Sequence, residues 1–394
     1  MEQEVTSQVG EKLRQAREKE KLSQSQVAEM VGCTREYISM IESGRRIPKL
    51  KLLKRLAAIY KVDIRWLLEG KEEAEPDTFK MLPRAPEITQ ADKKVIEEFV
   101  KYCEDYAWLE EKLGIKKHEM TEQRKPVPTS WREMRIQAKR LAMEERGRLQ
   151  LGDGPIRDIF LLLENQGVHV IRISLPNSQL DGIFAYDPEK GAFVLINTNR
   201  TKGKQTFTAA HEYCHYLRDR SRGYYPCKSE EDYLPYKSEE NYLTRIHRKD
   251  VERFADLFAT HFLMPEEGIR RIVEEQFGIG HALRAEEVIY LKRYFGVSYS
   301  AMLIRLLELG CITKDQYEQL KRVSVEKLER SLYGSEAEED RVLEPPKVPP
   351  TLVVLALEAY SRGFISLTRL AEIWRMKTSE VEEILQSAGY HIRK

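Results

Sequence analysis

His211 and His215, two histidines spaced four residues apart, are the side chains in this sequence best suited to bind one metal ion together. On an α-helix, residues i and i+4 lie one turn apart on the same face, so both imidazoles can reach a single ion. Glu212 follows the first histidine directly, and a carboxylate in this place can act as general base towards water at the metal. The HEYCH segment therefore predicts zinc-dependent hydrolysis, with Glu212 as the catalytic residue.

A third metal ligand is expected from the next helical run, which begins near Val251. Apolar residues recur there at helical spacing, and Glu252 lies at the edge of that stripe. Small alanines in both runs would let the helices approach closely enough for ligand bonds of about 2 Å. Asp256, one turn on, is expected to accept a hydrogen bond from a ligand imidazole. The alternatives for the third ligand are Asp219, Asp232 and His247, and a site with two histidines and a carboxylate also suits manganese or iron.

A second functional segment, residues 22–50, has the pattern of a helix-turn-helix. Ser23 and Gln26 form a capping box at the start of the first helix. Gly32 permits the tight turn, and Thr34 is the N-cap of the second helix. The inward faces are predicted to be Val27, Met30 and Val31 on the first helix, and Ile38 and Ile41 on the second.

This stretch resembles an Xre/lambda-repressor type helix-turn-helix, and the resemblance implies that the second helix of the pair enters the major groove of DNA. Its outward side chains are the candidates for base contacts, because Arg suits guanine and Glu suits cytosine. These candidates are Arg35, Glu36, Ser39 and Met40. A second group is expected to meet phosphates, through one amide and three positive charges. This group is Gln24, Arg45, Arg46 and Lys49.

The length and composition of the chain limit the classes of protein to which it can belong. The chain has 394 residues, of which 41% are hydrophobic and 33% charged, so it is long enough for two or three cores. The net charge of +1 says nothing about nucleic acid, so a DNA-binding patch must be local. Five scattered cysteines argue against a secreted disulfide framework, and neither a signal peptide nor an apolar run of membrane-spanning length is evident. We therefore expect a cytoplasmic protein without membrane contact.

The chain divides into segments by composition and periodicity. We predict a multidomain, mainly α protein with an all-α helix-turn-helix domain at 1–70. A linker and connecting helix follow at 71–130, and an α+β metallopeptidase domain with a small three-stranded sheet at 131–333. A charged, proline-rich linker at 334–350 leads to a small helical C-terminal domain at 351–394. That last segment is interpreted as a packing or dimerisation cap, with a second DNA reader as the alternative.

Two resemblances add to this interpretation. HEYCH followed by ERFADLFATHFLMP resembles the ImmA/IrrE family of gluzincin-like metallopeptidases, over roughly residues 131–323. The likeness implies a zinc endopeptidase with His211, His215 and Glu252 as ligands, of the kind that cuts helix-turn-helix repressors. The long interval 216–251, which carries a Tyr-rich duplication, departs from the family pattern. Residues 9–70, including IESGRRIP, resemble an Xre/lambda-repressor type domain.

Together these patterns predict a DNA-binding transcriptional regulator with a built-in zinc endopeptidase that cleaves itself or a partner helix-turn-helix repressor. The expected partners are a double-stranded DNA operator, that repressor or another protein substrate, and a second copy of the chain in a homodimer. One alternative is a repressor whose zinc domain senses a metal or ligand without turnover. Another is a housekeeping peptidase that uses its helix-turn-helix for protein contacts.

Overall fold

The computed structural model divides the chain into two compact units, Met1–Asp77 and Thr78–Lys394, which we describe separately. It describes residues 2–19, 22–46, 48–60, 89–116, 128, 130–176, 179–220, 224–228, 248–278, 280–334 and 348–389. Among the helices in these ranges, none is both long enough and apolar enough to cross a bilayer. Residues 61–88 lie outside the described ranges, so the predicted domain boundary at residue 70 stays a prediction.

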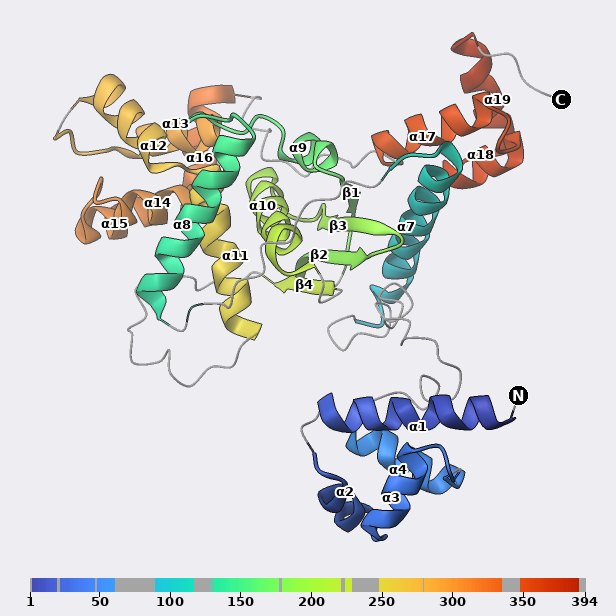
Figure 1. The fold of residues 1–394 in the computed structure, drawn as a ribbon. Helices are drawn as coiled ribbons and strands as arrows, with labels where there is room; N and C mark the ends of the chain where they lie inside the picture. Colours follow the sequence, from blue (N-terminus) through green and yellow to red (C-terminus); the bar gives the residue numbers. More distant parts are fainter. Residues whose placement is uncertain are drawn as a thin grey trace. The chain divides into compact units, whose positions relative to one another are not determined.

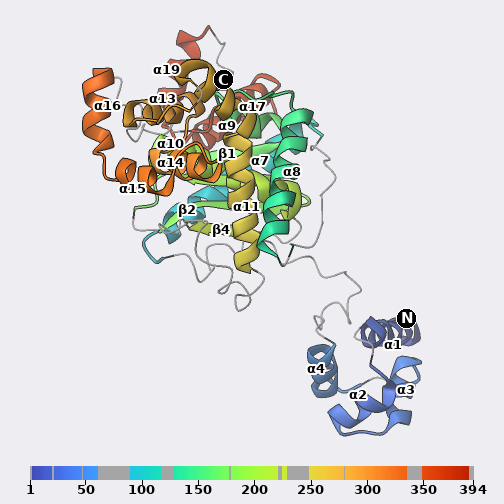
Figure 2. The same cartoon turned by 90° about the vertical axis from the view of Figure 1, so that its left-hand side faces the viewer.

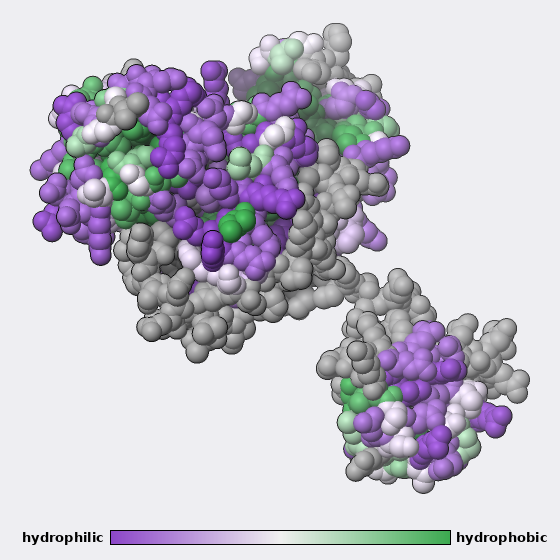
Figure 3. Space-filling model, turned by 60° about the vertical axis from the view of Figure 1, so that its left-hand side comes forward, coloured by the Kyte–Doolittle hydropathy of each residue, from purple (hydrophilic) through white to green (hydrophobic). Residues whose placement is uncertain are grey.

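The N-terminal unit is built from α1 (Glu2–Lys19), α2 (Gln24–Val31), α3 (Arg35–Glu42) and α4 (Leu50–Ile59). Its core brings together one apolar face from each helix, including Leu13, Val27, Ile38 and Leu56. In the view of Figure 3, hydrophilic residues cover most of the described surface of this unit. Met30 departs from the predicted inward face, because it is 52% exposed, whereas Val27 and Val31 are buried as predicted.

The larger unit is organised around a four-stranded sheet in the order β1-β3-β2-β4. β2 (Leu180–Asp187) and β3 (Gly191–Asn197) form the antiparallel hairpin that their alternating sequence predicts, and β1 (Val168–Ile173) pairs parallel with β3. The fourth strand, β4 (Tyr224–Lys228), pairs antiparallel with β2. This strand is additional to the three that the sequence predicts. The duplicated segment beyond β4 lies outside the described residues.

Helices cover one face of the sheet in two layers (Figure 1). α10 (Lys202–Arg218) lies directly on β2 and β3, and α11 (Arg248–Leu263) packs beyond it beside α8 (Trp131–Arg148), as Figure 2 also shows. Val170, Phe184 and Val194 point from the strands into this core. The remaining helices on this side are α9 (Ile159–Asn165), α12 (Glu266–Ile272), the π-helix η4 (Val273–Phe277), α13 (Ala285–Phe295), α14 (Tyr299–Glu308), α15 (Lys314–Lys321) and α16 (Val325–Tyr333).

The opposite face of the sheet is covered by α7 (Lys93–Leu113) and α17 (Pro350–Ser361), followed by α18 (Leu367–Ile373) and α19 (Thr378–Ser387). Ile171, Ile183 and Phe193 alternate along the strands with the residues that face α10, as the period of a strand requires. The segment 351–394, predicted as a domain of its own, therefore shares one hydrophobic core with α7 and the sheet. Its apolar residues are buried against residues far away in sequence.

Candidate metal centre and nucleic-acid interface

α10 is the central helix of the larger unit, and this placement positions the HEYCH segment. The helical spacing of its apolar residues predicts that only one face of α10 is buried. In the structure, however, every residue from Thr208 to Arg218 is buried. The physical reason is that the sheet covers one side of α10 while α9 and α11 cover the others. Alanines 209 and 210 on α10 and 255 and 259 on α11 are fully packed, which lets the two helices approach closely.

His211, His215 and Glu252 bring their donor atoms together between α10 and α11. Their potential ligand atoms all lie within 4.8 Å of one another. Nε2 of His211 lies 3.1 Å from Nε2 of His215 and 3.2 Å from Oε2 of Glu252. Nε2 of His215 lies 3.8 Å from Oε1 of the same carboxylate. The predicted ligands are thus gathered in one place.

The donor set fits a tetrahedral zinc ion in both chemistry and spacing. Imidazole nitrogen and carboxylate oxygen are common zinc donors, and bonds of about 2.0–2.1 Å at tetrahedral angles place neighbouring donors roughly 3.3 Å apart. The two shorter separations between His211 and its neighbours, 3.1 and 3.2 Å, are close to that value. Three protein ligands would leave the fourth position open, as in catalytic zinc sites.

Two aspartates lie on the far side of the imidazoles from the donor cluster. Nδ1 of His211 donates to Oδ1 of Asp256 at 2.8 Å, the contact that the sequence predicts. Oδ2 of Asp219 lies 3.8 Å from Nδ1 of His215. Asp219 is predicted from the sequence only as an alternative third ligand. It lies four residues after His215, and this spacing on a helix places its carboxylate against the His215 ring. The other two alternatives, Asp232 and His247, lie outside the described residues.

Charges within the cluster are complementary. Burial acts to raise the pKa of Glu252, but the imidazoles of His211 and His215, which face its carboxylate, outweigh burial and hold that pKa well below its usual range. Burial likewise acts to lower the pKa of His215, but the facing carboxylates of Asp219 and Glu252 raise it to about 9. Glu252 is thus anionic, and the imidazoles face a carboxylate on each side.

Glu212 differs from the other residues of the cluster. Its side chain is fully buried, and neither carboxylate oxygen has a hydrogen-bond partner among the described residues. Burial raises its pKa to about 7, with the two neighbouring histidines acting in the opposite direction. A carboxylate with a pKa near neutrality, adjacent to a metal-ligand set, is suited to accept a proton from water.

Gly182 on β2 makes the space that Glu212 occupies. A Cβ at this position would lie 2.5 Å from Cγ2 of Thr208, 2.9 Å from the carbonyl oxygen of Leu195 and 3.1 Å from Oε1 of Glu212. The strand and α10 therefore touch at a point where only hydrogen fits. Gly182 is not among the residues predicted from the sequence, although a glycine inside a strand pattern shortly before the HEYCH helix is a signal for such a close approach.

The helix-turn-helix caps are formed as predicted. The hydroxyl of Ser23 accepts from the backbone N–H of Gln26, whose side chain accepts from the N–H of Ser23. Thr34 accepts from the N–H of Tyr37 at the start of α3. Gly32 has φ of +69°, the left-handed conformation that its place between α2 and α3 requires.

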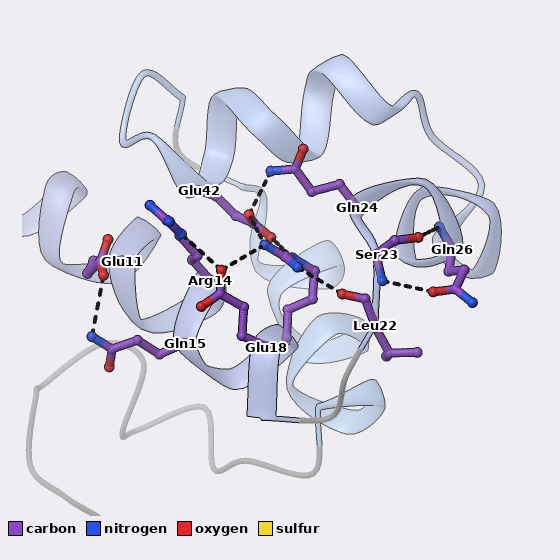
Figure 4. Close-up of polar contacts among 10 residues, drawn as sticks. Glu11, Arg14, Gln15, Glu18, Leu22, Ser23, Gln24, Gln26 and Glu42 are labelled. Carbon is purple, nitrogen blue, oxygen red and sulfur yellow. Dashed lines mark hydrogen bonds and ion pairs between the residues drawn. The ribbon is translucent and has the colours of Figure 1, made fainter.

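Glu42, at the end of α3, ties three helices together (Figure 4). Arg17 of α1 donates to both of its carboxylate oxygens, at 2.7 and 3.0 Å. Gln24, the first residue of α2, donates its amide to Oε2 at 2.8 Å. Gln24, proposed as a phosphate contact from sequence, thus has a structural partner.

The other DNA-contact candidates lie at the surface of the N-terminal unit. Arg35, Glu36 and Ser39 on α3 are exposed, and Met40 is half-buried. Arg45, Arg46 and Lys49 are exposed after α3, and the guanidinium of Arg46 lies 5.2 Å from the centre of the Tyr37 ring. The predicted base and phosphate contacts are therefore accessible at the surface of the unit, apart from Gln24, whose amide donates to Glu42.

Comparison with protein families matches two parts of the chain. Residues 13–67 match a helix-turn-helix family model, HTH_3, and residues 163–307 match Peptidase_M78, the IrrE N-terminal-like domain. The HTH-type transcriptional regulator SinR of Bacillus subtilis (strain 168) is 29% identical over 100 residues, covering 24% of this chain and 90% of SinR. SinR of Bacillus licheniformis has the same identity and coverage.

Solved structures give a much weaker likeness. Bacillus thuringiensis PlcR, in complex with the peptide PapR7 and DNA, is 12% identical with a TM-score of 0.17, covering 97% of each chain. The apo form of the competence regulator ComR from Streptococcus vestibularis is also 12% identical, with a TM-score of 0.16, covering 91% of this chain and 99% of ComR. TM-scores this low do not establish a shared fold. From the family matches, the chain is a DNA-binding regulator of the Xre helix-turn-helix type joined to a metallopeptidase-type domain of the Peptidase_M78 family, related to IrrE.

Proposed function

We propose that the Peptidase_M78-type domain is a zinc-dependent endopeptidase that cleaves either this chain or a partner helix-turn-helix repressor. The observation that carries the proposal is the convergence of His211, His215 and Glu252 beside Glu212, a buried carboxylate without a hydrogen-bond partner in the described structure. Fusion to a DNA-binding domain favours a regulator as the substrate. Cleavage of such a substrate would change which genes are transcribed.

Each side chain would have a distinct role in peptide hydrolysis. A zinc ion held by the two imidazoles and Glu252 would supply Lewis acidity, which activates water and polarises a peptide carbonyl. Glu212 would accept the proton from that water and pass it to the leaving amine. Asp256 would hold His211 with Nδ1 protonated, so that Nε2 faces the ligand position.

The proposal is tested by comparing the wild-type chain with Glu212→Gln, each loaded with zinc. Both proteins are incubated alone and with a candidate repressor of the same helix-turn-helix type, and the products are read by gel and mass spectrometry. We expect cleavage only with wild type, while Glu212→Gln binds the same amount of zinc. Metal analysis beside His211→Ala checks the ligand assignment, and identical banding from wild type and Glu212→Gln would refute the peptidase.

The same variants distinguish a catalytic peptidase domain from a zinc domain that senses a metal without turnover. If zinc alters the affinity for operator DNA equally in wild type and Glu212→Gln, the zinc domain works without turnover. If zinc has no effect on DNA binding but wild type still cleaves, the domain is a peptidase and does not act as a zinc sensor. DNA affinity that does not depend on salt would argue for a helix-turn-helix used in protein contacts.

The DNA-binding end has its own test. Arg45→Gln and Arg46→Gln each remove a predicted phosphate contact, so affinity should fall for all sequences and the salt slope should decrease by about 1 per residue. Arg35→Gln removes a predicted base contact and should relax specificity at one position, at a cost of about 1–3 kcal/mol. Titration of fluorescent operator DNA at several salt concentrations measures both effects. If a variant changes neither the affinity with its salt slope nor the base specificity, the replaced residue does not contact DNA.

A further inference from the structure

The last turn of α8 makes directional contacts with both helices of the proposed metal centre. Glu145 and Arg146, adjacent residues of this turn, are buried, with 3% and 4% of their surface exposed. The hydroxyl of Tyr213 on α10 donates to Oε1 of Glu145. Nη1 of Arg146 donates to the carbonyl oxygen of Phe262 on α11 at 2.5 Å. One turn of α8 is thus bonded to α10 and to α11.

The polar atoms of this turn have partners within the protein. Arg148 donates to both oxygens of Glu145, at 2.9 and 2.6 Å, and its Nη2 lies 3.3 Å from the hydroxyl of Tyr213. Arg146 donates its two remaining nitrogens to backbone carbonyls in the loop after α8, at 2.9 and 2.5 Å. A buried polar network in which every member is paired is rigid, because any movement leaves a buried group without a partner.

Tyr213 meets α11 on a different side of α10 from the imidazoles. Residues two apart on a helix lie about 200° apart around its axis, so Tyr213 points away from His211. Its ring passes Phe258 and Phe262 of α11, with ring centres 6.5 and 5.9 Å apart, whereas His211 meets α11 at Glu252. A rotation of α10 about its axis would therefore move Tyr213 and the imidazoles in opposite directions. Apolar packing is non-directional and restrains such a rotation less than a hydrogen bond does.

We propose that Glu145 and Tyr213 are positioning residues for the metal centre. Their hydrogen bond fixes the rotation of α10, and with it the direction in which His211 and His215 present Nε2 to Glu252. Neither residue belongs to the donor cluster, so both act through the helix that carries the histidines. Metal–ligand distances are set to within about 0.2 Å, so a small rotation of α10 is enough to weaken binding. The inference rests on the metal centre of the proposed function.

The test measures zinc affinity in the full-length protein by competition with a chromophoric chelator. Tyr213→Phe keeps the ring and removes the hydroxyl, and we expect it to bind zinc about 10-fold more weakly than wild type. Tyr299→Phe is the matched control, because it also removes a buried tyrosine hydroxyl, one that donates to the carbonyl of Leu320 at 3.2 Å. This control should bind zinc as tightly as wild type.

Two further measurements separate positioning from a general effect on stability. The visible absorption of bound Co²⁺ reports the coordination geometry, so its intensity per bound ion should change in Tyr213→Phe and stay unchanged in Tyr299→Phe. Glu145→Leu removes the acceptor and should match Tyr213→Phe in zinc affinity. The double variant should be no weaker than either single variant, because the two residues share one hydrogen bond.

The outcomes distinguish this inference from the metal centre on which it rests. Wild-type affinity and an unchanged Co²⁺ spectrum in Tyr213→Phe would overturn the positioning role, while loss of zinc binding in His211→Ala would still support the metal centre. Equal zinc binding by wild type and His211→Ala would overturn both together. Equal weakening in Tyr213→Phe and Tyr299→Phe, or additive losses in the double variant, would also overturn the positioning role.

Discussion

We expect Asp256 to influence the affinity of the proposed metal site without contacting the metal itself. Its carboxylate holds Nδ1 of His211 at 2.8 Å, which leaves Nε2 directed at the donor cluster. Partners of this kind fix the tautomer and the orientation of a ligand histidine.

We predict that Asp256→Asn lowers zinc affinity by about 10–100-fold while the fold is retained. An asparagine is isosteric, but it lacks the charge that favours a protonated Nδ1. Competition with a chromophoric chelator measures the affinity, and circular dichroism checks the fold. Glu274→Gln, an exposed carboxylate of η4, is the matched control and should leave affinity unchanged. Equal affinities for Asp256→Asn and wild type would show that His211 is oriented by packing alone.

Gly182 gives a second prediction at a single residue. Gly182→Ala should destabilise the protein by about 1–3 kcal/mol, because the new methyl group meets backbone on β3 and a side chain on α10. Urea unfolding measures this change in the free energy of unfolding. Gly147→Ala on α8, where a Cβ meets nothing within 4 Å, is the control and should be neutral or stabilising by about 0.5–1 kcal/mol. An unchanged urea midpoint for Gly182→Ala would show that β2 and α10 can move apart to accept the methyl group at little cost in free energy.

The residues of the site could be predicted from the sequence only where their spacing within one helix is informative. The distance along the chain from His211 to His215, and from Glu252 to Asp256, is one helical turn in each case, so each pair could be placed on one face. The small residues of α10 and α11 predict that the two helices approach closely, and in the structure the helices pack together with His211, His215 and Glu252 close to one another. Gly182 could not be found in this way, because its role depends on the register of β2 against a helix that follows two elements later.

At the scale of elements, α7 is joined to the sheet by a buried charged contact. His169 of β1 stacks on Tyr106 of α7, with ring centres 4.1 Å apart, and its nitrogens lie against Glu110 and Glu164. The helix and the strand therefore share a proton-dependent contact inside a mostly apolar core.

This contact predicts a loss of stability at alkaline pH. Since the folded-state pKa of His169 is raised to about 9 from an unfolded value of about 6.5, its contribution is fully present below pH 6.5 and is lost as the pH rises through 9. The contribution at low pH is roughly 3 kcal/mol. Urea unfolding between pH 6 and pH 10 should show a steeper decline for wild type than for His169→Gln. Parallel profiles would contradict the prediction.

The bounds of helices and strands could be predicted from the spacing of apolar residues where an element pairs with a neighbour close in sequence or forms on its own. The hairpin of β2 and β3 and the helix α7 lie where alternation and helical spacing predict them. β4 was missed because a short strand in a Tyr-rich stretch is ordered by pairing with β2, some forty residues earlier. The apolar residues of α17 and α18 indicate that a face must be covered, but not that α7 and the sheet cover it.

For the molecule as a whole, the division into two units predicts separate responses to metal removal. All three donor residues belong to the unit Thr78–Lys394. Saturation at 100 times the dissociation constant stabilises a folded unit by about 2.7 kcal/mol. In calorimetry of the full chain, a chelator should lower the melting temperature of one transition and leave the other unchanged.

The two transitions are assigned by a destabilising variant in the N-terminal core. Ile41→Ala removes a side chain that is 1% exposed and should lower only the transition that the chelator leaves unchanged. A single transition that shifts in both experiments would show that the units unfold together. The family matches, each confined to one unit, are consistent with separate folding.

The joint formed by Arg17, Gln24 and Glu42 has a consequence for how operator preference can evolve. The carboxylate that joins α1, α2 and α3 belongs to Glu42, the buried last residue of α3, whereas Arg35, Glu36 and Ser39 are exposed on the same helix. Replacement of the exposed residues therefore leaves the scaffold intact. If α3 contacts bases as we propose, exchange of these surface residues alone would give new target sequences, whereas loss of Glu42 would disrupt the helix-turn-helix whatever its target sequence.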